Sequence, residues 1–398
     1  MRPWILLGNP KNRRVSGFCE ALGRAGQRFA VCSWADFLDD VSGLVRVAGT
    51  LGPDGQDAFL RVDSIGEDAA VEQRLLRLGA GAARAEGVWV ATPAEIEALP
   101  QQFGRILAPR QLHLGFLAAL DLLDRVISTR PGWVVLNPTA TTRLCFDKRR
   151  SSRRLVELGV PVPRIVTVGS GGVRTPGDDT LPDPGAHGLV IKLASGSSAS
   201  CLGIWRNAPD PQRRGPFSRG PELFTSIERA RDGLYNSLRP RTYVGAPARE
   251  LVRMLLREGA HVEEFVPKAL LDGQNFDLRV LLVAGEPAFT LVRSSPHPVT
   301  NLHLGGSRGD PAQLGEVVRA GVMDAVHKSM RLIGREIPAL HLGVDVMIEA
   351  EPAPGSPGFR VLEINAFGDL LPNLERHEEG RAWSVYDWEI RAAGGSLG

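Results

Sequence analysis

The sequence predicts a mixed α/β protein composed of two or three compact units. Its length of 398 residues is too great for one small domain, because single domains usually hold roughly 50 to 200 residues. In the first third of the chain, short apolar runs alternate with segments of helical spacing, which is typical of a parallel sheet covered by helices. Near the C-terminus, two short strand-like runs carry acidic residues.

The N-terminal region is expected to form one parallel sheet. The predicted strands are 4–8, 29–33, 87–91 and 134–137, and the predicted helices are 17–26, 67–78 and 111–127. Alternating strands and helices favour parallel pairing, because parallel neighbours need a crossover connection. No GxGxxG motif follows the first strand, so the binding of a dinucleotide there has little support.

A polar cluster precedes the second of these helices. It comprises Arg61, Asp63, Ser64, Gly66 and Glu67. Ser64 and Glu67 have the spacing of a capping box, in which each side chain bonds the backbone N–H of the other residue. We therefore favour helix capping over catalysis here, although Arg61 could face a cleft. Arg110 and Gln111 open the third helix, where donors could face a substrate.

The chain changes character after residue 139. The predicted helices are 147–159, 248–259 and 311–332, and the predicted strands are 164–168, 188–193, 204–206, 261–266, 278–284 and 288–293. The last three strands are expected to form one antiparallel sheet. Residues 207–249 are rich in arginine, proline and glycine, so we expect an exposed insertion there.

Composition argues against several classes of function. Hydrophobic residues make up 43% and charged residues 23% of the chain, as in ordinary globular proteins. The formal net charge of +2 gives no strong field for nucleic acid or an anionic membrane, and no apolar run approaches the roughly 20 residues that span a bilayer. Cys19, Cys32, Cys145 and Cys201 show no CxxC spacing. They indicate scattered thiols in a reducing compartment, so a cytoplasmic protein is expected.

Lysine is scarce in this sequence. Of the 47 basic residues, five are lysines, namely Lys11, Lys148, Lys192, Lys268 and Lys328. Lysine supplies a compact point charge that the broad guanidinium of arginine does not reproduce. We therefore expect some of these lysines where such a charge is required, while others persist by chance.

The two strands near the C-terminus carry oxygen ligands. Residues two apart in a strand share a face, so Glu363 and Asn365 point together, and Asp345 can join them if the strands at 343–348 and 360–365 pair. Two carboxylates and an amide oxygen suit Mg²⁺, which also binds substrate phosphates and water. The alternative is a buried strand pair whose polar residues face solvent.

A loop of small residues follows the strand that contains Lys192. Ser195, Gly196, Ser197 and Ser198 open this loop. Small side chains let backbone N–H groups approach an anion closely, and hydroxyls add donors. A flexible hairpin is the alternative. A buried ammonium needs compensation, and an anionic phosphate would provide it.

Two arginines and an asparagine precede the acidic strands. They are Arg279, Arg293 and Asn301. Arginine suits bidentate contact with phosphate or carboxylate, although each arginine alone could form a surface ion pair. The informative feature is the order along the chain: two lysines, a small-residue loop, an acidic segment, arginines, asparagine and acidic strands.

This order of motifs resembles the ATP-grasp superfamily, and most closely its glutathione-synthetase/glutamate-ligase branch. The resemblance covers about 137–375, and 1–135 is similar to the α/β domain that precedes the fold in such enzymes. It implies an ATP-grasp fold with an N-terminal α/β domain at 1–136. Two α+β subdomains, at 137–259 and 260–398, would clasp the nucleotide.

The resemblance also implies roles for individual residues. The implied nucleotide-binding residues are Lys148, Lys192, Ser195, Gly196, Ser197, Ser198, Glu263, Glu264, Phe265, Val266 and Asn301. The lysines would bind phosphates, the small-residue loop would cover them as a lid, and the backbone of the acidic segment would read adenine. Arg279 and Arg293 match arginines that face the γ-phosphate and the acyl phosphate. Asp345, Glu363 and Asn365 match the Mg²⁺ ligands.

The sequence departs from the family pattern in two places. After Asn365 the chain reads Ala-Phe-Gly-Asp-Leu-Leu-Pro, in place of the Ser-Pro-Thr-Gly type of turn that is common in the branch, and it resembles a poorly characterised bacterial ATP-grasp group. The segment 207–249 is also unusual. Both departures lie where substrate recognition is expected, so the resemblance leaves the carboxylate donor and the amine acceptor open.

The function implied by the resemblance is an ATP- and Mg²⁺-dependent ligase that forms an amide through an acyl phosphate. Its partners would be ATP and a small carboxylate or amine, or a peptide that docks on the arginine-rich segment 206–249. A solvated loop is the alternative for that segment. A phosphotransferase on the same scaffold and a non-catalytic nucleotide- or peptide-binding module are the other functions left open. No nucleic acid or membrane partner is expected, and a homo-oligomer is expected only by analogy with related dimers and tetramers.

Overall fold

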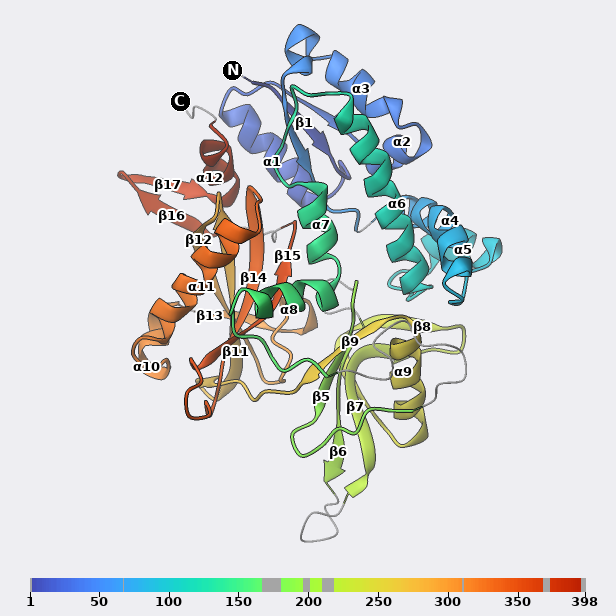
Figure 1. The fold of residues 1–398 in the computed structure, drawn as a ribbon, viewed down its shortest axis with the longest axis vertical. Coiled ribbons are helices and arrows are strands. Elements are labelled where there is room, and N and C mark those ends of the chain that lie inside the picture. Colours follow the sequence, from blue (N-terminus) through green and yellow to red (C-terminus); the bar gives the residue numbers. More distant parts are fainter. Residues whose placement is uncertain are drawn as a thin grey trace.

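The computed structural model describes residues 2–66, 68–166, 180–195, 201–209, 218–309, 311–367 and 373–394. Within these ranges the chain forms an N-terminal sheet, a middle sheet and a C-terminal sheet, together with a two-stranded ribbon. Figure 1 shows the N-terminal part at the top, the C-terminal sheet beneath it and the middle sheet at the bottom. The mixed α/β class predicted from the sequence is confirmed.

The N-terminal sheet is parallel, with strand order β2-β1-β3-β4. Its strands are β1 (Trp4–Leu7), β2 (Phe29–Cys32), β3 (Phe59–Val62) and β4 (Val134–Val135). Parallel pairing was expected, but β3 was not, because the charged Arg61 interrupts its apolar pattern. The strand expected at 87–91 is absent. Trp89 is exposed there, and the Ala91 N–H donates to the Gln111 side chain rather than to a neighbouring strand.

Helices connect these strands and follow the last of them. They are α1 (Arg13–Arg24), α2 (Trp34–Asp39), α3 (Ser42–Gly49), α4 (Ala69–Ala85), α5 (Pro93–Ala98), α6 (Pro109–Ser128), α7 (Thr139–Cys145) and α8 (Lys148–Glu157). Helices α4 and α6 cross at two glycines. A Cβ on Gly79 would lie 2.1 Å from the Gln111 carbonyl oxygen, and a Cβ on Gly115 would lie 1.8 Å from that of Leu75.

The N-terminus of α4 differs from the predicted capping box. Asp68 is the N-cap, and its side chain accepts hydrogen bonds from the N–H groups of Ala70 at 2.9 Å and Val71 at 3.2 Å. Ser64 instead accepts a bond from the Gly66 N–H at 3.1 Å. Glu67 lies outside the described residues. The prediction that Ser64 caps the helix is therefore wrong, because the helix begins later, directly after a second residue able to cap it.

The middle sheet is antiparallel, with strand order β8-β7-β6-β5-β9. Its elements are β5 (Leu189–Leu193), β6 (Leu202–Pro209), β7 (Ser218–Arg229), β8 (Leu234–Val244), α9 (Ala246–Arg257) and β9 (Ala260–Glu264). The expected insertion at 207–249 is therefore wrong, since β7 and β8 belong to the sheet. Leu223, Thr225 and Ile227 are buried along β7, but the surrounding arginine and proline obscured their period-two spacing.

The C-terminal sheet is also antiparallel, with strand order β13-β12-β11-β14-β15. Its strands are β11 (Gln274–Val283), β12 (Glu286–Ser295), β13 (Ser307–Gly309), β14 (His341–Ile348) and β15 (Phe359–Asn365), with β10 (Leu270–Leu271) paired to β11. Strand β9 was expected beside β11 and β12. It pairs instead with β5, where Val262 lies opposite Ile191.

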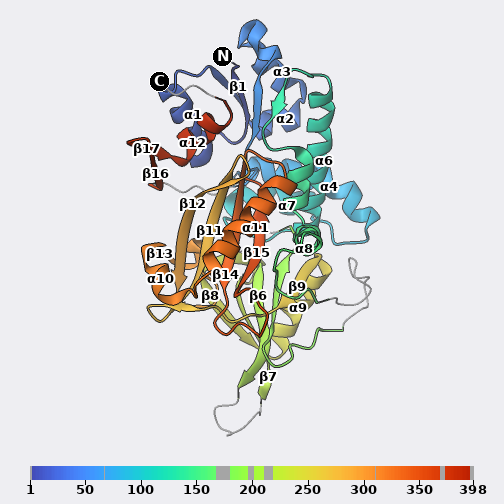
Figure 2. The same ribbon diagram turned by 60° about the vertical axis from the view of Figure 1, so that its left-hand side comes forward.

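Further helices complete the C-terminal part. The remaining elements are α10 (Leu314–Val317), α11 (Val322–Glu336), β16 (Glu375–Glu378), β17 (Arg381–Ser384) and α12 (Val385–Ala392). The single helix expected at 311–332 is interrupted, because Val318 is extended and Gly321 takes a left-handed conformation with φ of 81°. Figure 2 shows α11 lying across the C-terminal sheet, and α12 returns to the N-terminal part beside α1.

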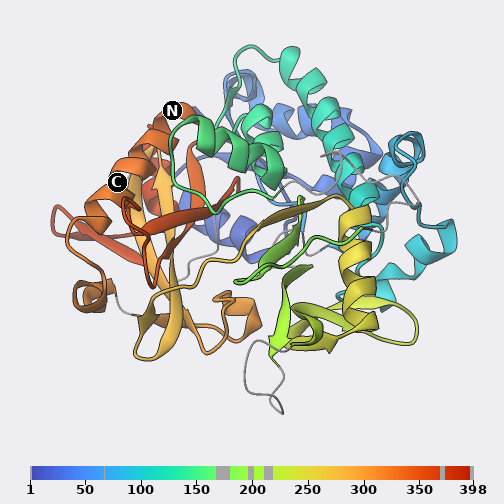
Figure 3. The same ribbon diagram turned by 60° about the horizontal axis from the view of Figure 1, so that its bottom comes forward.

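The two largest hydrophobic clusters of buried residues lie in different parts of the molecule. The larger joins the N-terminal part to the C-terminal sheet, with Leu7 and Phe116 in the same cluster as Phe276 and Val344. A separate core lies between α9 and the middle sheet, and Figure 3 shows α9 on the side of that sheet away from the C-terminal sheet. Within the described ranges, no helix is long and apolar enough to cross a bilayer. No disulfide joins the four cysteines, all of which the structure describes.

Candidate active site

A cavity of about 870 Å³, its open mouth included, lies between the middle sheet and the C-terminal sheet. Strands β5 and β6 form one wall, strands β11, β12, β14 and β15 form the other, and the start of α8 closes one end. The predicted site residues that line it are Lys148, Lys192, Glu263, Glu264, Phe265, Val266, Arg293, Asn301, Asp345 and Glu363. Folding thus brings to one place residues that are spread over half of the chain.

The remaining predicted residues lie around this cavity or away from it. Arg279 does not line it but contacts the Asp345 carboxylate, and Asn365 follows Glu363 by two positions on β15. Ser195 lines a different cavity. Gly196, Ser197 and Ser198 lie outside the described residues, so a phosphate lid at this loop stays a prediction.

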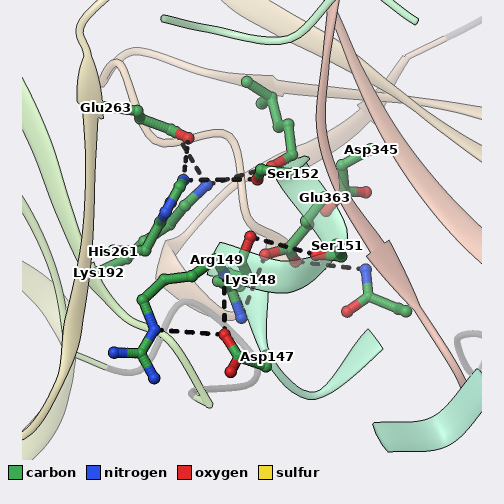
Figure 4. Close-up of polar contacts among 12 residues, drawn as sticks. Asp147, Lys148, Arg149, Ser151, Ser152, Lys192, His261, Glu263, Asp345 and Glu363 are labelled. Atoms are coloured by element: carbon green, nitrogen blue, oxygen red, sulfur yellow. Dashed lines mark hydrogen bonds and ion pairs between the residues drawn. The ribbon is translucent and has the colours of Figure 1, made fainter. Parts of the chain in front are cut away.

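Strands β14 and β15 pair as expected and set the acidic residues side by side. Their register places Asp345 opposite Glu363 and Gly343 opposite Asn365, with a bulge directly after Asp345. The Lys148 ammonium lies 3.4 Å from Glu363 Oε2, and Asn365 Nδ2 donates to Glu363 Oε1 at 3.3 Å. Burial opposes ionisation of Glu363, but Lys148 and Lys192 together lower its pKa to about 2. Figure 4 shows Asp345 and Glu363 on their neighbouring strands.

Asp345 is held by both predicted arginines. Its Oδ1 lies 2.7 Å from Arg279 Nε and 3.0 Å from Arg293 Nη2, and Arg279 Nη2 donates to its Oδ2 at 3.3 Å. Burial raises the pKa of Asp345 to about 7, and Glu363 and Asp277 add to this effect against the two arginines. Burial alone would favour the protonated form of this carboxyl group, and Arg279 and Arg293 stabilise its charged form.

Lys192 is compensated by protein groups rather than by a phosphate alone. Its Nζ donates to Glu263 Oε1 at 2.8 Å and to the Leu362 carbonyl oxygen at 3.2 Å. The other oxygen of Glu263 lies 3.1 Å from His261 Nε2, and all three polar side chains are buried. Figure 4 shows this cluster. The side chain of Glu263 thus acts as a counter-ion, which the sequence did not indicate.

The expected adenine-reading segment, residues 263–266, comprises the end of β9 and the start of the connection to β10. Glu264, Phe265 and Val266 all line the cavity. The Glu264 N–H bonds to the Arg164 carbonyl oxygen at 2.9 Å, and the Phe265 N–H bonds to that of Gly188 at 3.0 Å. Two N–H groups of the segment therefore donate to backbone carbonyl oxygens of the protein, and these hydrogen bonds fix the path of the segment along the cavity.

A second charged cluster was missed by the sequence reasoning. Lys268 Nζ lies 3.0 Å from Asp277 Oδ2 and 2.7 Å from Thr300 Oγ1, and Thr300 also bonds to Asp277. Arg293 Nε lies 2.7 Å from Asp277 Oδ1, which connects this cluster to Asp345. Burial lowers the pKa of Lys268. The scarcity of lysine in the sequence could have indicated that Lys268 belongs to the site.

The acidic pair and its amide neighbour are the side chains that the sequence predicts to bind a metal ion. Within the described part of the chain, no group of three or more His, Cys, Asp and Glu side chains could hold a metal ion. Asp345, Glu363 and Asn365 instead offer two carboxylates and one amide, with Asp345 opposite Glu363 and Asn365 bonded to it. Hard oxygen donors of this kind suit Mg²⁺, which completes its shell with phosphate and water.

Three polar residues considered for the cleft have structural contacts instead. Arg61 is buried between Asp63 and Glu389. Gln111 donates to the Leu76 carbonyl oxygen at 2.6 Å, and Arg110 forms a bidentate pair with a glutamate of the N-terminal part, both bonds being 2.7 Å. The suggestions that Arg61 faces a cleft and that Arg110 and Gln111 face a substrate are not supported by these contacts.

No protein-family model matches the chain, and no curated protein matches it. Among solved structures, it is similar to the ATP-grasp ligase PsnB complexed with a minimal precursor, at 14% identity and a TM-score of 0.48 over 100% of both chains. It is also similar to the macrocyclase MdnC from Microcystis aeruginosa MRC bound with precursor peptide MdnA, at 13% identity and a TM-score of 0.46 over 98% of this chain and 99% of that one. D-alanine–D-alanine ligase from Bacillus anthracis complexed with ATP matches at 11% identity and a TM-score of 0.44, over 99% of this chain and 92% of that one. These matches to ATP-grasp ligases extend over nearly the whole chain, at 11 to 14% identity.

Proposed function

We propose that this chain is an ATP-grasp enzyme that uses ATP and Mg²⁺ to join a carboxylate to an amine. The observation that carries the proposal is the meeting of Lys148, Lys192 and Arg293 with Asp345 and Glu363 at one cavity. Cations beside a carboxylate pair suit a polyphosphate that shares a divalent ion with the protein.

The charges around the cavity leave room for an anion. The cations are Lys148, Lys192, Lys268, Arg279 and Arg293, and the carboxylates paired with them are Glu263, Asp277, Asp345 and Glu363. The cations exceed the carboxylates by one, so the cluster remains positive without a ligand. A nucleotide triphosphate brings several negative charges, which such a cluster and a metal ion together would offset.

The cavity lining combines charged and apolar residues, and this combination would orient the nucleotide. Val190 and Ile204 of the middle sheet and Met347 of the C-terminal sheet line the cavity together with the segment 264–266. A purine would lie between these apolar walls. The triphosphate would then extend toward Lys148 and the acidic pair.

Mg²⁺ would be held by Asp345, Glu363 and Asn365. Their side-chain oxygens come from adjacent positions of paired strands, so the backbone register fixes their spacing. When bound, the ion offsets the negative charge that develops on the phosphates during transfer. Arg279 and Arg293 keep the Asp345 carboxylate oriented, and Arg293 also reaches the cavity itself.

The reaction needs no nucleophilic side chain. A carboxylate oxygen of the donor attacks the γ-phosphorus, the bond to the β-phosphate oxygen breaks, and ADP and an acyl phosphate form. The amine nitrogen then attacks the acyl carbon, phosphate leaves, and one proton is released. Carboxylate, ammonium and ATP thus give amide, ADP, inorganic phosphate and a proton, and the protein contributes position and charge stabilisation.

A nucleotide assay on the full chain tests the proposal. ATP is titrated calorimetrically with and without Mg²⁺, and amino acids, small carboxylates and peptides are then screened for ADP release, with products followed by mass spectrometry. A product whose mass equals both substrates minus water supports the ligase, whereas a phosphorylated substrate would make the enzyme a phosphotransferase. The absence of nucleotide binding would contradict the proposal and favour a non-catalytic module.

A variant pair sharpens this assay. Glu363→Ala should abolish Mg²⁺-dependent ATP turnover without unfolding the chain, because it removes one carboxylate of the proposed metal site. Glu351→Ala, at an exposed position between β14 and β15, is the matched control and should turn over ATP normally. Normal turnover by Glu363→Ala would overturn the metal assignment.

A further inference from the structure

A second cavity lies where the N-terminal part meets the middle sheet. It measures about 1210 Å³ with its mouth, and its walls come from the segment after β3, the start of α4, residues 104–116 and Ser195. Leu193 lines both this cavity and the first one. Phe146 faces the second cavity, and Lys148, two residues later, faces the first. The second cavity therefore adjoins the end of the first that holds Lys148, where the triphosphate is placed by the proposed function.

Polar groups in this wall lack partners. His113 is 6% exposed, and its Nδ1 has no hydrogen-bond partner among the described residues. Glu72 forms no ion pair within the described part of the chain, and burial alone raises its pKa to about 7. Arg105 also lines the cavity, but its guanidinium lies over the Tyr235 ring, 5.9 Å from the centroid, and it is not among the charges acting on Glu72.

A partly buried carboxyl that has no ion-pair partner within the described part of the chain is costly to keep charged. A structural role for Glu72 would normally show a cation or a donor beside it, as Arg61 shows between Asp63 and Glu389. The cost is removed if a ligand brings the cation. A ligand would also supply a partner for His113. Burial and the neighbouring Arg110 lower the pKa of His113 to about 4, so its ring is neutral at physiological pH. The unpartnered Nδ1 is then available for a hydrogen bond.

The rest of the wall is mostly apolar. Leu75, Leu107, Leu112, Phe116 and Phe146 supply hydrophobic surface around the two polar groups. Phe116 and Phe146 form a ring pair with centroids 4.8 Å apart. Asp68 also lines the cavity, but its carboxylate caps α4, so Glu72 is the carboxyl left for a ligand. A free carboxyl beside aromatic walls favours an organic cation with an apolar body.

We propose that the second cavity binds the amine substrate as an ammonium group with an apolar body, with Glu72 as its counter-ion and His113 as a hydrogen-bond partner. The inference rests on the proposed function, because the amine must approach an acyl phosphate formed in the adjoining cavity. Both Glu72 and His113 are positioning residues here. The apolar walls supply affinity, and the carboxylate distinguishes an amine from an alcohol of the same shape.

Benzylamine, which is protonated at neutral pH, serves as the probe, and benzyl alcohol is its neutral counterpart. Binding to the full chain is measured by calorimetry and by ligand-observed nuclear magnetic resonance. Benzylamine should bind the wild type more tightly than benzyl alcohol does. Glu72→Gln should weaken its binding by about tenfold or more, because a charged hydrogen bond is lost, whereas Glu72→Asp keeps the charge and should retain more of the affinity.

The control variant is Glu97→Gln, an exposed glutamate on α5, which should bind benzylamine like the wild type. Thermal unfolding of each variant verifies that the fold is intact. The inference is overturned if benzylamine does not bind the wild type, or if it binds Glu72→Gln equally well. ATP is titrated into the same samples, so failure of ATP to bind the wild type would identify a failure of the proposed function rather than of the amine site.

Discussion

Lysine is distributed selectively in this molecule. Lys148, Lys192 and Lys268 line the cavity of the proposed nucleotide site, whereas Lys11 and Lys328 are exposed. Each cavity lysine has its ammonium within 3.4 Å of a carboxylate oxygen. A compact ammonium can occupy such a place and still turn toward a ligand, whereas a planar guanidinium needs more space and a fixed orientation.

Exchange of each lysine for arginine tests this interpretation. Lys148→Arg, Lys192→Arg and Lys268→Arg should each weaken ATP binding by about tenfold, because the larger group overfills a packed wall. Lys11→Arg and Lys328→Arg should bind ATP normally. The measurement is calorimetric titration with Mg²⁺, after thermal unfolding has shown that the variants are folded. Equal effects at cavity and surface positions would contradict the interpretation.

The residues of the site were only partly readable from the sequence. Asp345, Glu363 and Asn365 could be placed together because strand alternation and short spacing limit where their side chains point. The partner of Lys192 could not be predicted in this way. Glu263 reaches Lys192 through the pairing of β5 with β9, and the register between distant strands depends on the whole sheet. Lys268 was visible as a rare residue, but its contacts with Asp277 and Thr300 required the tertiary structure.

At the scale of elements, the crossing of α4 and α6 shapes the second cavity. Gly79 and Gly115 let the two helix backbones approach closely, and Leu75 of α4 and Leu112 and Phe116 of α6 line the cavity wall. The side chain of any other residue at either glycine would meet backbone atoms, which cannot move as a flexible side chain can. The helices would have to separate.

Alanine substitutions at two glycines of α4, Gly79 and Gly81, should therefore change the free energy of unfolding in opposite directions. Gly79→Ala should lower the free energy of unfolding by about 1 to 3 kcal/mol through overpacking. Gly81→Ala, two positions later in α4, meets no atom within 4 Å and should raise it by roughly 0.5 to 1 kcal/mol through helix propensity. Denaturant unfolding measures both values. A stabilising Gly79→Ala would show that the helices are not closely packed there.

A second element-scale contact ties the C-terminal helix α12 to the N-terminal part. The Arg61 guanidinium pairs with Glu389 of α12 and with Asp63, all within the buried interior, and it lies 3.9 Å from the centroid of the Phe18 ring on α1. A nearby pair, Arg24 with Asp387 at 3.2 Å, links α1 to α12 at the surface. The two pairs differ mainly in burial.

Removal of the buried arginine should cost much more than removal of the exposed one. Arg61→Met leaves two buried carboxylates without their cation and should destabilise the chain by about 3 to 5 kcal/mol. Arg24→Met should cost less than about 1 kcal/mol, because water already solvates that pair. Urea titration distinguishes these values. Similar losses in both variants would mean that Arg61 contributes little more than a surface charge.

Some elements could be predicted and others could not, for physical reasons. The strands β1, β5 and β14 have apolar runs with clear ends, and α8 has Asp147 as N-cap before it and Gly159 after it. Strands β7 and β8 were misread because edge and solvent-facing strands tolerate arginine and proline. The break between α10 and α11 depends on one left-handed glycine, Gly321, which sequence periodicity alone does not reveal.

At the scale of the whole molecule, the cavity of the proposed nucleotide site lies between two separately packed bodies. The N-terminal part and the C-terminal sheet share one hydrophobic core, while the middle sheet and α9 have their own. The lining residues Lys192 and Ile204 come from the second body, and Asp345 and Glu363 come from the first. We infer that the middle body opens more easily than the rest, because its own core is the smaller of the two.

Hydrogen exchange should therefore show two levels of protection in the absence of nucleotide. Amides of β5–β9 should exchange faster than those of β11, β14 and β15. ATP with Mg²⁺ bridges both bodies in the proposed site, so it should protect strands on both sides. At about one hundred times the Kd, the gain is about 2.7 kcal/mol, which corresponds to roughly hundredfold slower exchange through any opening that releases the nucleotide. Glu363→Ala should lose this gain in both bodies together, and protection confined to one body would show that the nucleotide does not bind between them.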